Sequence, residues 1–218
     1  MVLNPVQWRV PPFAIHGHMY EWDAARAQCW VVTRREGVLK RVGHDLRIVV
    51  ERFFLRASAE QRTAELSVDS ESLKVDCALE GERRLPGALS TRDRSTINEQ
   101  LRSEVLRTRL HPEVRFTSEA LTPALWQALT TAYEFSTGPT AQGTPPGPTA
   151  LPGSVSLCGV TRPVSVQVRA TPQGLLAHAS IDQTRFGIEP YRGMLGALRV
   201  SASVDVYLQI HSSQSTGQ

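Results

Sequence analysis

The sequence predicts a mainly β fold in which eight antiparallel strands close into a barrel, together with one or two helices. Apolar and polar residues alternate with a period of two in many segments, most strictly from Leu198 to Ile210, and this is the pattern of half-buried strands. Short polar turns join neighbouring strand segments. A chain of 218 residues is long enough to bury the core of one such domain.

The first strands follow an irregular, proline-rich arm predicted over residues 1–18. Strand patterns occur at 27–36, 37–59 and 63–75, each with apolar residues at every second position. Because polar turns separate them, the three segments are expected to form an antiparallel meander.

One segment has helical rather than strand spacing. Residues 93–112 are expected to form an amphipathic helix, with Asp93 or Ser95 available as N-cap and Pro112 preventing further extension. Its apolar positions are Ile97, Leu101, Val105 and Leu110. A second, weaker helix is predicted over residues 122–133.

The remaining strands come after this helical region. The tract Ser136–Gly153 is dominated by Gly, Pro and Thr and is expected to be a flexible loop, because such a composition favours neither a helix nor a strand ladder. Strand patterns resume after it and continue to Ile210, and residues 212–218 are expected to be a disordered tail.

A barrel of eight strands has an interior that side chains can fill or that can hold one small ligand. Alternation cannot separate these two outcomes, so a packed core and an apolar pocket both remain open. If the interior is a pocket, the predicted ligand-binding residues are the inward positions Val31, Leu46, Ile48, Val50, Leu66, Val68, Phe116, Val164, Val166, Val168, Phe186, Val200, Val204 and Val206.

Four blocks of the sequence resemble the YceI-like family in the family's order. They are EGVLKRVGHDLRI, RDRSTINEQLRSEVLRTRLHPEVRF, GSVSLCGVTRPVSVQV and FGIEPYRGMLGALRVSASVDVYLQI, and together they cover most of Tyr20–Ile210. The resemblance implies a lipocalin-like barrel domain over residues 19–211, with a helix across it. It also implies an elongated cavity that binds a polyisoprenoid, an isoprenoid quinone or a fatty-acid-like lipid, for transport, storage or stress protection, without catalysis.

Residues 121–152 look like an insertion relative to that family. Two interpretations are open: the segment covers the pocket as a lid, or it is a solvated loop. Its composition favours the loop.

Composition limits the partners and the location of the protein. Lys and Arg number 24 against 21 Asp and Glu, a net charge of +3, and the arginines are scattered among acidic residues, so no nucleic-acid partner is expected. No apolar run is long enough for a membrane span. The N-terminus has no apolar signal region, which predicts a cytoplasmic protein; an export signal ahead of Met1 would instead predict the periplasm. The 3 cysteines are expected to be buried free thiols.

Two alternative functions come from other residues. A metal-dependent enzyme could use His16, His18 and His44, joined by Asp45 and His111, but this spacing fits no established ligand motif, and neither a metal nor a cofactor is predicted. A filled barrel could instead be a protein-interaction module whose outer face presents Trp30, Val32 and Tyr207. A homodimer is left open.

Overall fold

A computed structural model describes residues 19–36, 44–135, 147–193 and 198–211. The arm predicted over 1–18 and the tail predicted over 212–218 therefore lie outside the described residues. The rest forms one antiparallel sheet of 13 strands with two α-helices. The strands are β1 (Met19–Trp22), β2 (Ala27–Glu36), β3 (Asp45–Val50), β4 (Phe53–Ser58), β5 (Thr63–Asp69), β6 (Leu73–Glu80), β7 (Arg83–Leu85), β8 (Glu113–Ser118), β9 (Thr149–Leu157), β10 (Val160–Thr171), β11 (Gly174–Asp182), β12 (Arg192–Gly193) and β13 (Leu198–His211).

The prediction of eight strands is wrong in number, since the described residues contain 13. Two long strand patterns are each interrupted at a corner: β3 and β4 are separated at Glu51 and Arg52, and a 3₁₀ turn, η1 (Ser70–Ser72), separates β5 from β6. A side-chain contact links the two corners, because Asp69 beside η1 accepts a hydrogen bond from Arg52 Nε of the β3–β4 corner at 2.7 Å. Alternation continues through such a corner and does not reveal it. The short strands β1, β7 and β12 contain too few residues to show a period.

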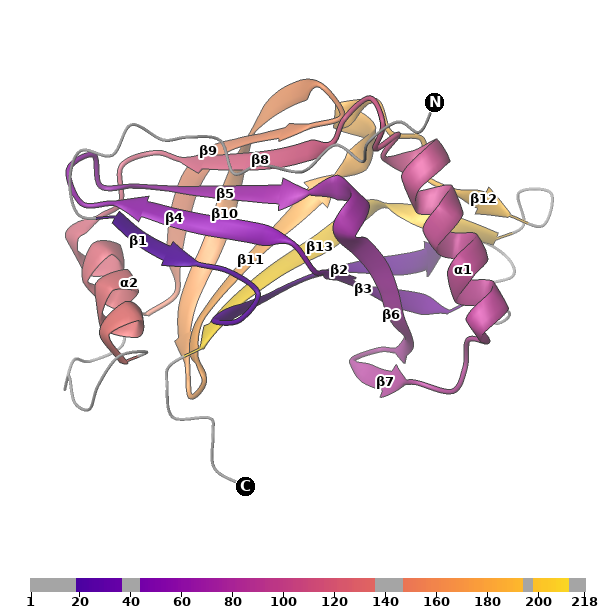
Figure 1. Ribbon diagram of the computed structural model, residues 1–218, viewed down its shortest axis with the longest axis horizontal. Coiled ribbons are helices and arrows are strands. Elements are labelled where there is room, and N and C mark those ends of the chain that lie inside the picture. Colours follow the sequence, from indigo (N-terminus) through magenta and orange to yellow (C-terminus); the bar gives the residue numbers. More distant parts are fainter. Residues whose placement is uncertain (1–18, 37–43, 136–146, 194–197, 212–218) are drawn as a thin grey trace, which may run out of the picture.

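The sheet is strongly curved (Figure 1). Its strand order is β1-β4-β5-β8-β9-β10-β11-β13-β2-β3-β6-β7, with β12 paired to β13. The chain runs directly from β3 into β4 and from β5 through η1 into β6, so these two long segments connect the two ends of the strand order. As a result the inward residues of strands far apart in sequence face the same interior.

The helix after β7 begins earlier than the sequence predicts. Helix α1 (Thr91–Gln100) has Ser90 as its N-cap, in place of the expected Asp93 or Ser95. The Ser90 side chain accepts from the Asp93 N–H, and the Asp93 carboxylate accepts from the Ser90 N–H at 3.0 Å, which forms a capping box. The chain then continues as a π-helical turn, η2 (Leu101–Val105). The helical region thus ends at Val105 and not at Pro112 as expected, and Leu110 lies beyond it and is 72% exposed.

The segment expected to be a solvated loop is partly regular structure. Helix α2 (Pro123–Phe135) forms as the weak helical pattern predicts, and it lies at the end of the sheet opposite α1 (Figure 1). Strand β9 begins at Thr149, inside the predicted loop, and pairs from Thr149 to Gly153 with Val168 to Val164 of β10. The sequence misses this part of β9 because its pairing partner, and not its own composition, fixes its extended conformation.

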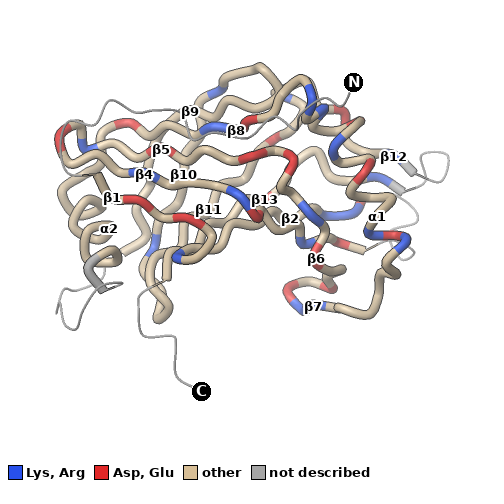
Figure 2. Tube along the Cα trace, viewed as in Figure 1, with Lys and Arg blue, Asp and Glu red and all other residues tan. Residues whose placement is uncertain are grey.

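Charged residues of both signs are distributed along the strands and on α1 (Figure 2). Cys29, Cys77 and Cys158 are free and buried, as predicted. In the described ranges no helix combines the length and the apolar character that crossing a membrane requires.

Candidate functional site

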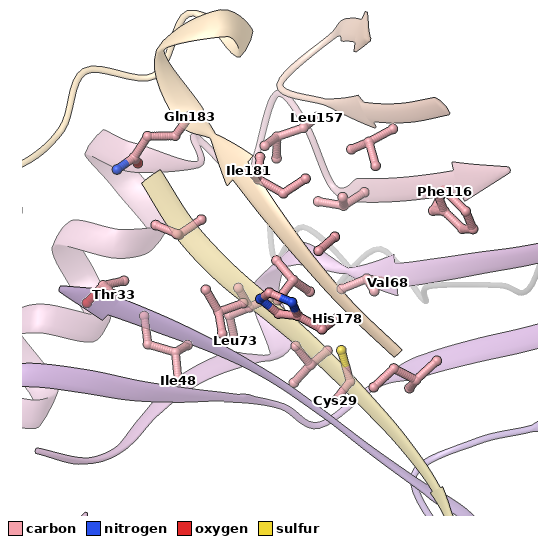
Figure 3. A pocket seen from close by; sticks show the side chains of 18 of the residues that line it. Cys29, Thr33, Ile48, Val68, Leu73, Phe116, Leu157, His178, Ile181 and Gln183 are labelled. Carbon is pink, nitrogen blue, oxygen red and sulfur yellow. The ribbon is translucent and has the colours of Figure 1, made fainter. Parts of the chain in front are cut away.

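The curved sheet and the two helices enclose a cavity of about 690 Å³ (Figure 3). This volume is in the range of sites that hold one small-molecule ligand, so the interior is an open pocket and not a filled core. The cavity is long as well as narrow. On β13 its wall runs from Val200 to Ile210, and ten steps of about 3.3 Å make this roughly 33 Å along the strand.

The structure places thirteen of the fourteen predicted pocket residues on the cavity wall. They come from six strands, β2, β3, β5, β8, β10 and β13, and are Val31, Leu46, Ile48, Val50, Leu66, Val68, Phe116, Val164, Val166, Val168, Val200, Val204 and Val206. Contact between these side chains and a ligand stays a prediction.

Phe186 is the exception. It lies in the 3₁₀ turn η3 (Gln183–Phe186), where its side chain is 4% exposed and packs in the core away from the cavity wall. The period of two holds only in strands, so it could not assign the direction of a residue in this turn.

Sequence reasoning missed several parts of the wall. For β11 and for the second half of β9, the alternation of apolar and polar residues could have identified the inward side chains. No such signal marks the helical contributions, because a helix shows which face is apolar but not what that face covers. The missed apolar wall residues include Leu151, Val155, Leu175, Ala177, Ala179, Ile181, Leu89, Ile97, Leu101, Val105, Leu121, Leu125 and Leu129.

The cavity has a polar, open end at α1. The exposed residues on its wall, His44, Arg92, Asp93, Thr96 and Arg199, all lie on α1 or on strand ends near it. We call this set, together with Arg35, Gln100 and Tyr191, the mouth. The mouth lies where the inward face of β2 changes from apolar to charged, and Thr33 lies toward α1 in Figure 3.

Arg35, near the end of β2, and His44, just before β3, both line the cavity at the mouth. Thr33 of β2 pairs with Leu46 of β3, and this register, continued by two residues, sets Arg35 opposite His44. The backbone N–H of Arg35 donates to Asp45 Oδ1 at 2.9 Å, and the Arg35 guanidinium Nε lies 3.8 Å from the same oxygen. These contacts hold the end of β2 against the start of β3.

Positive charge exceeds negative charge at the mouth. Its one carboxylate, Asp93, is engaged in the α1 capping box, and hydrogen bonds from the Ser90 side chain and backbone lower the pKa of Asp93. Within the described part of the chain, neither Arg92 nor Arg199 forms an ion pair. The mouth therefore carries an excess of cationic side chains, which suits an anionic or strongly polar group.

The opposite end of the cavity is apolar and closed. Three leucines of the α2 region, Leu121, Leu125 and Leu129, lie on the wall and are 3%, 1% and 8% exposed. Their burial shows that little solvent reaches the cavity from this side.

The cavity wall offers little reactive chemistry. Cys29 lies on it (Figure 3), but burial raises the pKa of the Cys29 thiol to about 12, so the reactive thiolate is suppressed at neutral pH. In the described segments no three His, Cys, Asp or Glu residues gather as a metal site would require. Of the histidines considered as metal ligands, His44 is at the mouth, whereas His16 and His18 lie outside the described residues.

The outer face of the sheet carries a separate aromatic cluster. The Trp30 and Tyr207 rings stack at 5.2 Å, and Tyr207 stacks on His178 at 4.7 Å. They lie beside a small buried cluster of Val32, Cys77 and Leu79. His178 borders the cavity in Figure 3, but its Nε2 pairs with Asp205 Oδ1 at 3.1 Å. The predicted interaction face is thus an ordered stack, and a partner for it stays a prediction.

Comparisons with solved structures find proteins that are similar to this chain. A polyisoprenoid binding domain from Saccharophagus degradans has a similar structure, with a TM-score of 0.53 and 12% identity over 88% of this chain and 98% of that one. Burkholderia cenocepacia BcnA aligns with a TM-score of 0.48 and 14% identity over 85% of this chain and 97% of that one. A Campylobacter jejuni YCEI protein gives a TM-score of 0.35 and 9% identity over 94% and 92% of the two chains.

A search of curated protein sequences finds no match. The sequence model of the YceI-like domain, however, matches residues 20–212, which include every described element of the sheet except the first residue of β1. The chain belongs to the YceI-like family.

Proposed function

We propose that this protein binds one long-chain amphiphile, an isoprenoid or a fatty-acid-like lipid, and leaves it chemically unchanged. The tail occupies the cavity and the polar head lies at the mouth beside α1. The observation that carries the proposal is the shape and polarity of the cavity: long, apolar along its walls, closed at α2 and open between cationic side chains at α1.

Burial of the tail supplies the main driving force for binding. Apolar area removed from water contributes about 25 cal/mol per Å², so a tail that buries about 300 Å² gains roughly 7 kcal/mol before the entropy of association is subtracted. The wall need only exclude water and match the width of the tail. A wall of valines and leucines with few reactive groups suits this role.

The family supports the same class of ligand. The solved Saccharophagus degradans domain is described as a polyisoprenoid binding domain, and its fold is shared with this chain. We extend its ligand class to this protein on the basis of the cavity and not of sequence identity. Transport, storage and protection of the lipid are all roles that reversible binding would serve.

The test is to purify the full chain under native conditions, extract it with organic solvent and identify the extract by mass spectrometry. Metal content is measured on the same sample. A stoichiometric isoprenoid or fatty chain supports the proposal. A protein that carries no lipid and also fails to take up added isoprenoids or fatty acids contradicts it, and a stoichiometric metal would redirect attention to His44.

A further inference from the structure

The cavity has a definite floor, and the floor is made by the segment that the sequence marks as an insertion. Leu121, Leu125 and Leu129 recur every four residues and so lie along one face of the α2 region. All three are buried and all three line the cavity. A tail that enters at α1 and runs the length of the sheet meets this leucine face last.

The floor is fixed firmly to the sheet. The Leu121 N–H donates to the Arg62 carbonyl in the β4–β5 turn at 2.6 Å. The Thr122 hydroxyl accepts from the Leu125 N–H at 3.3 Å, which caps the start of α2. These bonds tie the beginning of the helix to one rim of the curved sheet.

Aromatic contacts fix the flank of α2 that adjoins this leucine face. Tyr20 of β1 meets Trp126 edge to face at 5.6 Å and Tyr133 at 4.9 Å. Trp22, which is 1% exposed, meets Tyr133 at 5.4 Å. A helix held at both ends and along one side has little freedom to move away from a longer tail.

We propose that α2 sets the maximum tail length that the cavity accepts, with Leu125 and Leu129 as the residues that determine it. This inference rests on the proposed function, because it assumes that a tail enters from the α1 end. It assigns to the insertion the role of limiting the chain length of the ligand, and we call this the proposed length limit.

The experiment measures the affinity of delipidated full-length protein for linear saturated fatty acids of increasing length, by displacement of a fluorescent fatty acid. Each added CH₂ that is buried should strengthen binding by about fourfold. The gain in affinity should stop at the chain length that reaches α2. We call this chain length the break, and it is the quantity that the experiment measures.

Two substitutions at the floor should move the break in opposite directions. Leu125→Ala deepens the cavity and should shift the break to longer acids, whereas Leu129→Phe makes it shallower and should shift the break to shorter ones. Circular dichroism establishes that each variant is folded. If Leu125→Ala does not fold, Leu129→Ala tests the same shift at the more exposed position.

The matched control is Ile181→Ala on β11, a buried residue of the side wall. It should weaken binding of all acids that reach it without moving the break. If the folded α2 variants bind acids and the gain in affinity stops at the same chain length as in the unaltered protein, the proposed length limit is wrong while lipid binding stands. If the unaltered protein binds neither these acids nor isoprenoid alcohols of increasing length, the proposed function fails, and the proposed length limit fails with it.

Discussion

The ring of Phe116 on β8 occupies the space where a side chain at Gly153 on β9 would lie. A Cβ placed on Gly153 would be 2.5 Å from Phe116 Cε2 and 2.5 Å from the backbone oxygen of Thr117. Because Phe116 also lines the cavity, the absence of a side chain at Gly153 lets an aromatic ring complete the wall at this point.

Gly153→Ala should therefore destabilise the protein. The ring of Phe116 can shift, but the backbone of Thr117 cannot do so without distorting β8, so the free energy of unfolding should fall by about 1–3 kcal/mol. Urea unfolding measures the change. Gly147→Ala is the control, since nothing lies within 4 Å of its added Cβ, and an equal loss in both variants would contradict the steric argument.

Val166→Trp should block ligand binding while preserving the fold. Val166 points into the cavity from β10, and an indole there fills space that the tail would occupy. We expect at least a tenfold loss of affinity for a fluorescent fatty acid, with little change in melting temperature. The neighbouring Gln167→Trp, on the exposed side of the same strand, should bind as the unaltered protein does. Equal binding by the two variants would show that the ligand lies elsewhere.

Arg92→Gln and Arg199→Gln should discriminate between head groups. Both residues are exposed at the mouth, and an exposed ion pair contributes about 0.2–1 kcal/mol. Each substitution should weaken binding of a fatty acid by up to about fivefold and leave binding of the alcohol of equal length unchanged. Added salt should reduce the difference. Arg169→Gln, on the outside of β10, is the control; equal losses for acid and alcohol would argue against a cationic mouth.

Asp76 should make the protein sensitive to acid. It is left out of the β3–β6 pairing, because Ile48 pairs with Val75 and Arg47 with Cys77. Arg47 and Arg84 each donate to Asp76 Oδ2 at 2.5 Å. Burial raises the pKa of Asp76, but the hydrogen bonds and charges of these two guanidinium groups lower it by more, and its net pKa is below the usual value.

A carboxyl whose pKa is lower in the folded state stabilises the fold above its unfolded pKa, and this stabilisation is lost as the pH falls through the folded pKa. Asp76→Asn should thus lower the free energy of unfolding by about 1–2 kcal/mol at neutral pH. The difference should shrink below about pH 4. Urea unfolding over a pH series tests this, with exposed Glu119→Gln as control. A difference that does not change with pH would contradict the proposed electrostatic origin.

The sequence by itself determined the faces of the strands and therefore most of the cavity wall. Val31 in β2 and Val204 and Val206 in β13 were assigned inward from alternation alone, because a strand presents every second side chain to the same side. The bounds of β2 and the existence of α2 were also predictable, since each depends on a local pattern.

Only the tertiary structure decided where the wall opens and where it ends. Four features depend on partners that are distant in sequence, which the alternation pattern does not reveal. They are the corner at Arg52, the corner at η1, the start of β9 and the direction of Phe186. The same holds for the cationic mouth, where Arg35 of β2 and Arg92 of α1 line the same opening. It also holds for the leucine floor of α2. A helix sequence shows that Leu125 must be buried, but the curved sheet beneath it determines that this burial closes a cavity.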